Sequence, residues 1–200
     1  MSTSRSTPRL RLTALLLAGV VALVAVSERT AADGLAGQWL QLAGLACMAS
    51  AALGRIWTSV FIAGFKDVQL VRRGPYAVLR HPLYGLSLLA VLGIGLTSRS
   101  ASVATILLAS FTAIYVSAAR AEDRLLRAGH GADFVRYAGQ VRAFLPRWSA
   151  YEVPDSLEVR PRILWKAFLD AGSLLGLWML LVAADGLQRN GLTPTWITLP

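Results

Sequence analysis

Five stretches without a charged side chain constrain the fold of this chain more than any other feature. They cover residues 12–27, 34–54, 82–98, 100–119 and 171–184. A helix needs roughly 17–25 mainly apolar residues to cross the hydrocarbon core of a bilayer. The first stretch is marginal and the last is short, but flanking Arg or Lys side chains can reach the interface and extend such helices. The pattern predicts an all-α, polytopic membrane protein with about five transmembrane helices.

The composition agrees with this class. Hydrophobic residues make up 55% of the chain and charged residues only 16%, whereas about 25% of the residues of a soluble domain are charged. No nucleic-acid motif accompanies the net charge of +9, so we predict no nucleic-acid partner and attribute the basic excess to topology and anionic lipid. Cys47 is the single cysteine, which excludes an internal disulfide and a cysteine-based zinc site. We predict no metal site.

The basic residues also predict an orientation. With five helices and a cytoplasmic N-terminus, every Lys and Arg falls on the cytoplasmic side except Arg29, Arg99 and Arg189. Because basic residues favour cytoplasmic loops, we expect an integral protein of a bacterial-type inner or cell membrane with its N-terminus inside. Residues 12–27 also resemble a signal peptide, whose cleavage would leave four helices in the same orientation.

Two segments next to the predicted transmembrane helices are not expected to span the membrane themselves. Residues 56–65 are apolar but too short to span, which suits an interfacial or re-entrant segment. Residues 120–147 are expected to continue the fourth transmembrane helix into the cytoplasm and to end near Pro146, since proline cannot continue a helix interior. Gly93 and Gly95 should permit close packing of the third helix.

The C-terminal part leaves two interpretations open. Residues 159–169 could lie along the membrane surface, or residues 167–169 could extend the last helix if Asp170 lies near the interface. We expect three regions. They are an N-terminal two-helix hairpin (1–54), a functional core (55–147), and a surface segment followed by the last helix and tail (148–200).

Two polar clusters flank the predicted helical hairpin of residues 82–119 on its cytoplasmic side. The first contains Gly74-Pro75-Tyr76 and Arg80-His81-Pro82-Leu83-Tyr84, and the second is Glu122-Asp123. Charged side chains at a membrane edge are costly and usually functional. The clusters therefore predict a ligand site at the membrane surface.

The first cluster, together with Leu70-Val71, resembles the first signature of a membrane methyltransferase superfamily. This superfamily includes isoprenylcysteine carboxyl methyltransferases and phospholipid N-methyltransferases. Glu122-Asp123 stands where the second signature begins with paired carboxylates. The residues that follow at the family's spacing are Leu126, Gly131, Tyr137, Val141, Phe144, Leu145 and Pro146. The resemblance covers residues 55–147 in two blocks of the correct order.

Four positions depart from the family's pattern. The second carboxylate is Asp123 rather than glutamate, and Phe134 replaces the usual tyrosine. His130 stands where an aromatic residue is usual. Leu86 replaces a glycine, with Gly85 one position early, which puts in doubt any contact that needs a close backbone approach there.

The resemblance implies S-adenosylmethionine as cofactor, and the residue types suit its groups. Carboxylates can bind its amine or ribose, Arg80 its carboxylate as a bidentate fork, and tyrosine faces its adenine. We assign Arg80 and Glu122 as catalytic. The expected cofactor-binding residues are Tyr76, His81, Pro82, Tyr84, Gly85, Asp123 and Tyr137.

Structural roles remain open for these residues. Arg80 could only reach lipid phosphate, and His81 could only cap a helix. Glu122 and Asp123 could pair with arginines at helical spacing, and the tyrosines could be interface anchors.

The predicted function is S-adenosylmethionine-dependent methylation of a lipid-like or small hydrophobic acceptor, at a carboxyl or an amine. The expected partners are membrane lipid and a hydrophobic or lipidated acceptor that enters laterally from the bilayer. Two alternatives remain: an NADPH-dependent membrane reductase, since sterol reductases are similar in arrangement near their C-terminal ends, and a non-catalytic membrane assembly or regulatory protein on the same scaffold.

Overall fold

The computed structural model describes residues 34–62, 70–152 and 161–192, together with residues 19, 27–29, 157, 159 and 197–199. The α-helices are α2 (Leu35–Ile62), α3 (Pro75–Val78), α4 (Pro82–Ser98), α5 (Ala101–Gln140) and α6 (Pro161–Arg189). A short 3-10 turn, η1, covers Trp148–Ala150, and the strands β1 (Ser27–Arg29) and β2 (Ile197–Leu199) pair in parallel. Apart from this small ladder, helices joined by short loops make up the described chain, as expected of an all-α membrane protein.

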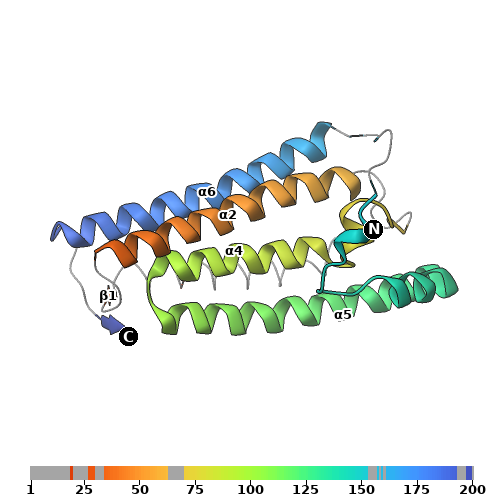
Figure 1. The fold of residues 1–200 in the computed structure, drawn as a ribbon, viewed down its shortest axis with the longest axis horizontal. Helices are drawn as coiled ribbons and strands as arrows, with labels where there is room; N and C mark the ends of the chain where they lie inside the picture. Colours follow the sequence, from red (N-terminus) through yellow and green to blue (C-terminus); the bar gives the residue numbers. More distant parts are fainter. Residues whose placement is uncertain are drawn as a thin grey trace.

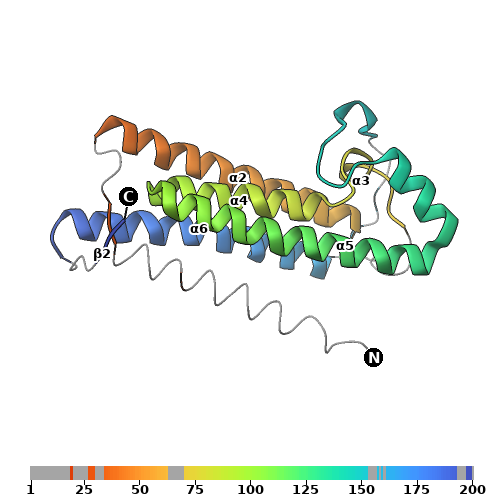
Figure 2. The same cartoon turned by 90° about the horizontal axis from the view of Figure 1, so that it is seen from below.

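Four long helices lie side by side and form the body of the molecule (Figures 1 and 2). Helix α4 is central, because it packs against α2, α5 and α6, while α2 also packs along α6. The buried core lies between these helices and consists of Met48, Val91, Ile94, Val103, Leu107, Phe111 and Leu181.

Small residues set the spacing of the central helices. A Cβ atom at Gly93 would lie 2.7 Å from the carbonyl oxygen of Gly44 on α2, and one at Gly95 would lie 2.9 Å from Ala104 on α5. Larger side chains at these positions would force the helices apart. The expected packing role of Gly93 and Gly95 is confirmed.

The helices account for four of the five charge-free stretches. Helices α2, α5 and α6 are long and apolar enough to cross a membrane, and α4 is a shorter apolar helix. Helix α4 coincides with the stretch 82–98 and begins with Pro82 at its first position, where proline is favoured. The remaining stretch, 12–27, lies outside the described residues except for Gly19 and Ser27.

Two charged residues lie inside helices that the sequence pattern had divided. Helix α2 continues through Arg55 to Ile62, so residues 56–62 extend the second apolar helix and do not form the separate segment that we expected. Helix α6 begins at Pro161 and includes Asp170, so residues 161–169 belong to the last helix. Arg55 donates to Ser87 Oγ (2.7 Å) and lies 4.0 Å from the Asp170 carboxylate. These contacts compensate both charges.

A further polar cluster, around Arg99 and Asp185, lies where α4 turns into α5. We call this end of the bundle the far end, because it is opposite the two predicted polar clusters. Arg99 at this turn donates to the Asp185 carboxylate of α6, and both residues are about 95% buried, with exposures of 4% and 5%. Gln41 of α2 and Arg189 of α6 contact the other carboxylate oxygen at 2.8 and 3.2 Å. The cluster therefore links three helices.

Helix α5 extends beyond its neighbours and then reverses direction. Gly131 has φ 51° and ψ −123°, a backbone conformation that favours glycine, and the helical path turns there. Figure 2 shows residues 132–140 folding back toward α3. The predicted helical continuation is confirmed, although the helix ends at Gln140, before Pro146. This turn carries Phe134 and Tyr137 over the first polar cluster.

Candidate functional site

The first motif is held in place by backbone hydrogen bonds to the segment that follows α5. The amides of Arg80 and His81 donate to the carbonyls of Arg142 (2.9 Å) and Ala143 (3.3 Å), and the Arg147 amide donates to Val78 (3.0 Å). Segments more than 60 residues apart in the sequence thus form one short extended pair, which fixes the start of α4.

Gly74-Pro75-Tyr76 forms the turn that leads into α3. Gly74 has φ 59°, and a Cβ atom there would lie 2.2 Å from the Phe61 ring. Both the positive φ and the lack of space require glycine. Tyr76 is buried, and its carbonyl accepts a 2.7 Å hydrogen bond from the Tyr137 hydroxyl. Burial disfavours the phenolate and raises the pKa of both tyrosines above 10.

The two predicted polar clusters meet directly. His81 Nε2 lies 2.9 Å from Asp123 Oδ1, and His81 Nδ1 lies 3.6 Å from Glu122 Oε2. Arg80 Nη2 lies 3.3 Å from the other oxygen of Asp123. An imidazole can donate from both nitrogens only when it is protonated. The four side chains form one charged constellation at the membrane-edge end of the bundle, which we call the site end.

Arg80 is mostly buried beneath the returning part of α5. Its guanidinium lies 5.8 Å from the centre of the Phe134 ring, within cation–π range, and Nη1 lies 3.5 Å from the Ala138 carbonyl. Its Nε atom is buried without a hydrogen-bond partner in the described part of the chain. Such unpartnered buried donors are rare in folded proteins.

Aromatic rings surround His81. Tyr84 and Phe144 lie 5.7 and 6.0 Å from its ring, and Tyr84 stacks on Tyr115 of α5 at 5.6 Å. Such flat, half-apolar surfaces suit a nucleobase or another planar group.

Beside this constellation lies a pocket of about 580 Å³, within the range of small-molecule sites. It is lined by Arg80, Ser117, Arg120, Asp123, Arg124, Arg127 and Phe134. The three arginines of α5 were not predicted as site residues, because membrane topology already accounted for their charge. Their spacing of three and four residues places them on one helical face with Asp123, and this periodicity could have identified them.

The structure brings all nine predicted site residues to the site end, in different capacities. Four form the charged constellation, and the three tyrosines lie around it. Pro82 starts α4, and the Gly85 amide donates to the His81 carbonyl at 3.2 Å, so both act through the backbone. Leu86 lies against Gly54 of α2, which places this departure from the family's pattern in a helix contact.

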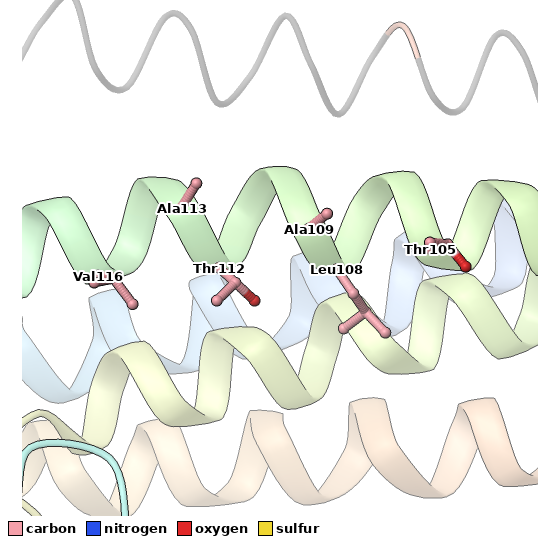
Figure 3. A pocket seen from close by; sticks show the side chains of 6 residues that line it. All are labelled: Thr105, Leu108, Ala109, Thr112, Ala113 and Val116. Atoms are coloured by element: carbon pink, nitrogen blue, oxygen red, sulfur yellow. The ribbon is translucent and has the colours of Figure 1, made fainter.

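A second pocket, of about 600 Å³, runs along the membrane-embedded part of α5 (Figure 3). Its lining residues lie on successive turns of one helix: Thr105, Leu108, Ala109, Thr112, Ala113 and Val116. Their positions continue in register into Ser117, Arg120 and Arg124 of the first pocket. One face of α5 therefore carries an apolar groove and, further along the helix, a basic pocket.

A comparison with protein families identifies the class of this fold and site. The phospholipid methyltransferase family model matches residues 34–133, which include α2, α3, α4 and most of α5. The chain belongs to this family. The match supports the proposed membrane methyltransferase superfamily and an integral membrane protein.

Two curated relatives carry names from metal resistance. The chain is 33% identical to the cobalt-zinc-cadmium resistance protein CzcN of Cupriavidus metallidurans over 156 residues, which cover 78% of this chain and 72% of that protein. It is 29% identical to the nickel-cobalt-cadmium resistance protein NccN of Alcaligenes xylosoxydans xylosoxydans over 185 residues, which cover 90% and 86%. No solved structure gives a significant match. Within the described residues, no group of three His, Cys, Asp or Glu side chains could hold a metal ion.

Proposed function

We propose that the protein transfers a methyl group from S-adenosylmethionine to a lipid-like acceptor, at a carboxyl or an amine, on the cytoplasmic face of the membrane. The observation that carries this proposal is the meeting of Arg80 and His81 with Asp123 beside a pocket, at 3.3 and 2.9 Å. Membership of the phospholipid methyltransferase family supports methyl transfer in a membrane.

The residue types at the site end suit this cofactor. Glu122 and Asp123 would bind its amine or ribose, and the guanidinium of Arg80, which lines the pocket, would donate to its carboxylate. Tyr84 and Phe144 offer apolar faces for adenine. When bound, the cofactor supplies an activated methyl group. The chain then mainly has to align the acceptor and exclude water.

The residue roles depend on the acceptor. A carboxylate acceptor needs no base, and Arg80 would supply its counter-charge. An amine acceptor must lose a proton, which the Glu122 carboxylate could accept because its side chain is partly exposed beside His81.

The groove on α5 supports an acceptor with a hydrocarbon chain. Residues 105–116 span roughly 17 Å at the helical rise of 1.5 Å per residue, about half of a 30 Å hydrocarbon core. A chain lying in this groove would direct its polar end to Ser117 and Arg120.

The names of the relatives lead to a second proposal, that the methylated product contributes to metal tolerance. Methylation of a carboxylate removes its charge, and complete methylation of an amine removes its lone pair. Either product is a poorer ligand for a divalent cation. Growth in cobalt or cadmium, compared between cells with the protein and cells with its Asp123→Asn variant, tests this role separately from binding.

Isothermal titration of the purified full chain with S-adenosylmethionine tests the primary proposal. Asp123 contacts both Arg80 and His81, so Asp123→Asn should weaken binding at least tenfold, since a charge-assisted hydrogen bond contributes about 1.5–3 kcal/mol. Asp133→Asn, which alters an exposed carboxylate of the same helix, should not change binding.

The absence of binding by folded wild-type protein would refute the proposal. Competition by NADPH would favour the reductase. Binding without a 14-dalton product in lipid extracts would favour a non-catalytic role.

A further inference from the structure

The pocket at the site end carries an unusual charge balance. Among the described residues that line it, four are arginines and one, Asp123, carries a carboxylate. Asp123 already contacts both Arg80 and His81. Within the described residues no ion pair involves Arg120, Arg124 or Arg127, and the nearby carboxylates of Asp123 and Asp133 pair with other side chains. Among the described residues, the pocket thus presents more positive charge than its lining carboxylate, Asp123, can neutralise.

This charge suits an anion better than the proposed cofactor. S-adenosylmethionine has a sulfonium, an ammonium and a carboxylate, so its net charge is positive. Three further guanidinium groups would repel it, whereas arginine binds phosphate or carboxylate through paired, planar hydrogen bonds. The cofactor's single carboxylate already has a donor in Arg80. The other three arginines therefore suit a different, anionic ligand.

The position of the three arginines indicates which ligand. They lie on the face of α5 that continues the apolar groove, and they begin one turn beyond Val116. Residues 120–127 extend roughly 10 Å along the helix axis, comparable to a lipid head group. A molecule with its chain in the groove has its head among these guanidinium groups.

We propose that Arg120, Arg124 and Arg127 form the subsite for an anionic group of the methyl acceptor, a phosphate or a carboxylate joined to a hydrocarbon chain. This subsite rests on the proposed methyltransferase function. It assigns to the pocket a role in acceptor recognition, separate from cofactor binding around His81 and Glu122.

Titrations of the full chain in a neutral detergent test the subsite. The probes are dihexanoyl phosphatidic acid, decanoate and uncharged dihexanoylglycerol. We expect an anionic probe to bind and the uncharged one to bind at least tenfold more weakly. The triple variant R120Q/R124Q/R127Q should lose at least tenfold in affinity for the anionic probe, while its affinity for S-adenosylmethionine should not fall, because the lost guanidinium groups repel this cation.

The triple variant R136Q/R142Q/R147Q is the matched control, because it removes the same charge from exposed arginines that do not line the pocket. An equal loss of affinity for the anionic probe in the control would show that net charge alone causes the effect, and it would overturn the subsite. Equal binding of all three probes, or loss of cofactor binding in the pocket variant, would also overturn it. Preference for phosphatidic acid over decanoate identifies phosphate, and the reverse identifies carboxylate. If the anionic probe binds through the three arginines and wild-type protein does not bind the cofactor, the methyltransferase proposal fails and the anion site remains.

Discussion

The Arg99–Asp185 cluster at the far end should be a major determinant of stability. Asp185→Ala leaves the guanidinium of Arg99 buried without its carboxylate, and Arg99 Nε and Nη1 already lack hydrogen-bond partners in the described residues. Breaking a buried ion pair by removing one partner costs about 3–5 kcal/mol. For a chain of this size, 1 kcal/mol shifts the unfolding midpoint by about 2–4 °C. We therefore expect a midpoint roughly 6–20 °C lower.

The single cysteine provides the assay. Cys47 lies on α2 against α4, since a Cβ atom at Gly93 would be 3.2 Å from Cys47 Cβ. Its thiol should react with a fluorescent maleimide when the α2–α4 contact opens. Labelling is measured against temperature in detergent for wild-type protein and Asp185→Ala, under identical lipid and detergent conditions.

Two variants separate the buried pair from general charge effects. Asp133→Ala breaks only exposed contacts and should cost less than about 1 kcal/mol. The double variant Arg99→Leu/Asp185→Leu removes both charges and should recover most of the lost stability, because apolar replacements of a buried pair are often neutral. A midpoint for Asp185→Ala equal to that of Asp133→Ala would refute the reasoning. A double variant as unstable as the single one would refute it too.

Two further predictions concern the site end. Tyr137→Phe should cost about 1 kcal/mol, because the Tyr76 carbonyl loses its hydrogen bond. Since the folded state raises the pKa of Tyr137 and keeps a proton that the unfolded chain releases, stability should fall as pH rises above 10, and Tyr137→Phe should reduce this fall in alkaline thermal melts. Gly131→Ala should destabilise by about 1–2 kcal/mol, because its φ is 51°, and should weaken cofactor binding in the same titration by displacing Tyr137. Gly129→Ala, where added atoms meet nothing within 4 Å, should not weaken it.

The transmembrane arrangement was largely predictable because charge is rare in this chain. Helix α4 matches its charge-free stretch at both ends, since Pro82 begins a helix well and the turn at Arg99 ends it. The same rule divided α2 and α6 incorrectly at Arg55 and Asp170. A sequence window treats each charge as a boundary, whereas the folded protein places Arg55 beside Ser87 and Asp170.

For the site, the sequence predicted which residues lie together but not which of them form contacts. The residues of the two motifs were predictable as a group, because both motifs leave the same end of the predicted α4–α5 hairpin. The partners were not, because Asp123 contacts Arg80 and His81 rather than an arginine at helical spacing on its own helix. Gly131 marks a local break in the helix, but the direction of the returning segment depends on the long-range contacts of Phe134 with Arg80 and of Tyr137 with Tyr76.

The charged side chains of the bundle differ in whether a carboxylate compensates them. Arg99 is 4% exposed and contacts a buried carboxylate, and Arg55 also has a carboxylate and a hydroxyl within reach. Such compensation is expected where charge must be held in an apolar environment. Arg124 and Arg127 are exposed and have no carboxylate partner in the described residues, so water solvates them and bundle stability gains little from them. Arginines that line a pocket without stabilising the fold can bind an anionic ligand at little cost to the bundle, whereas Arg99 is committed to Asp185.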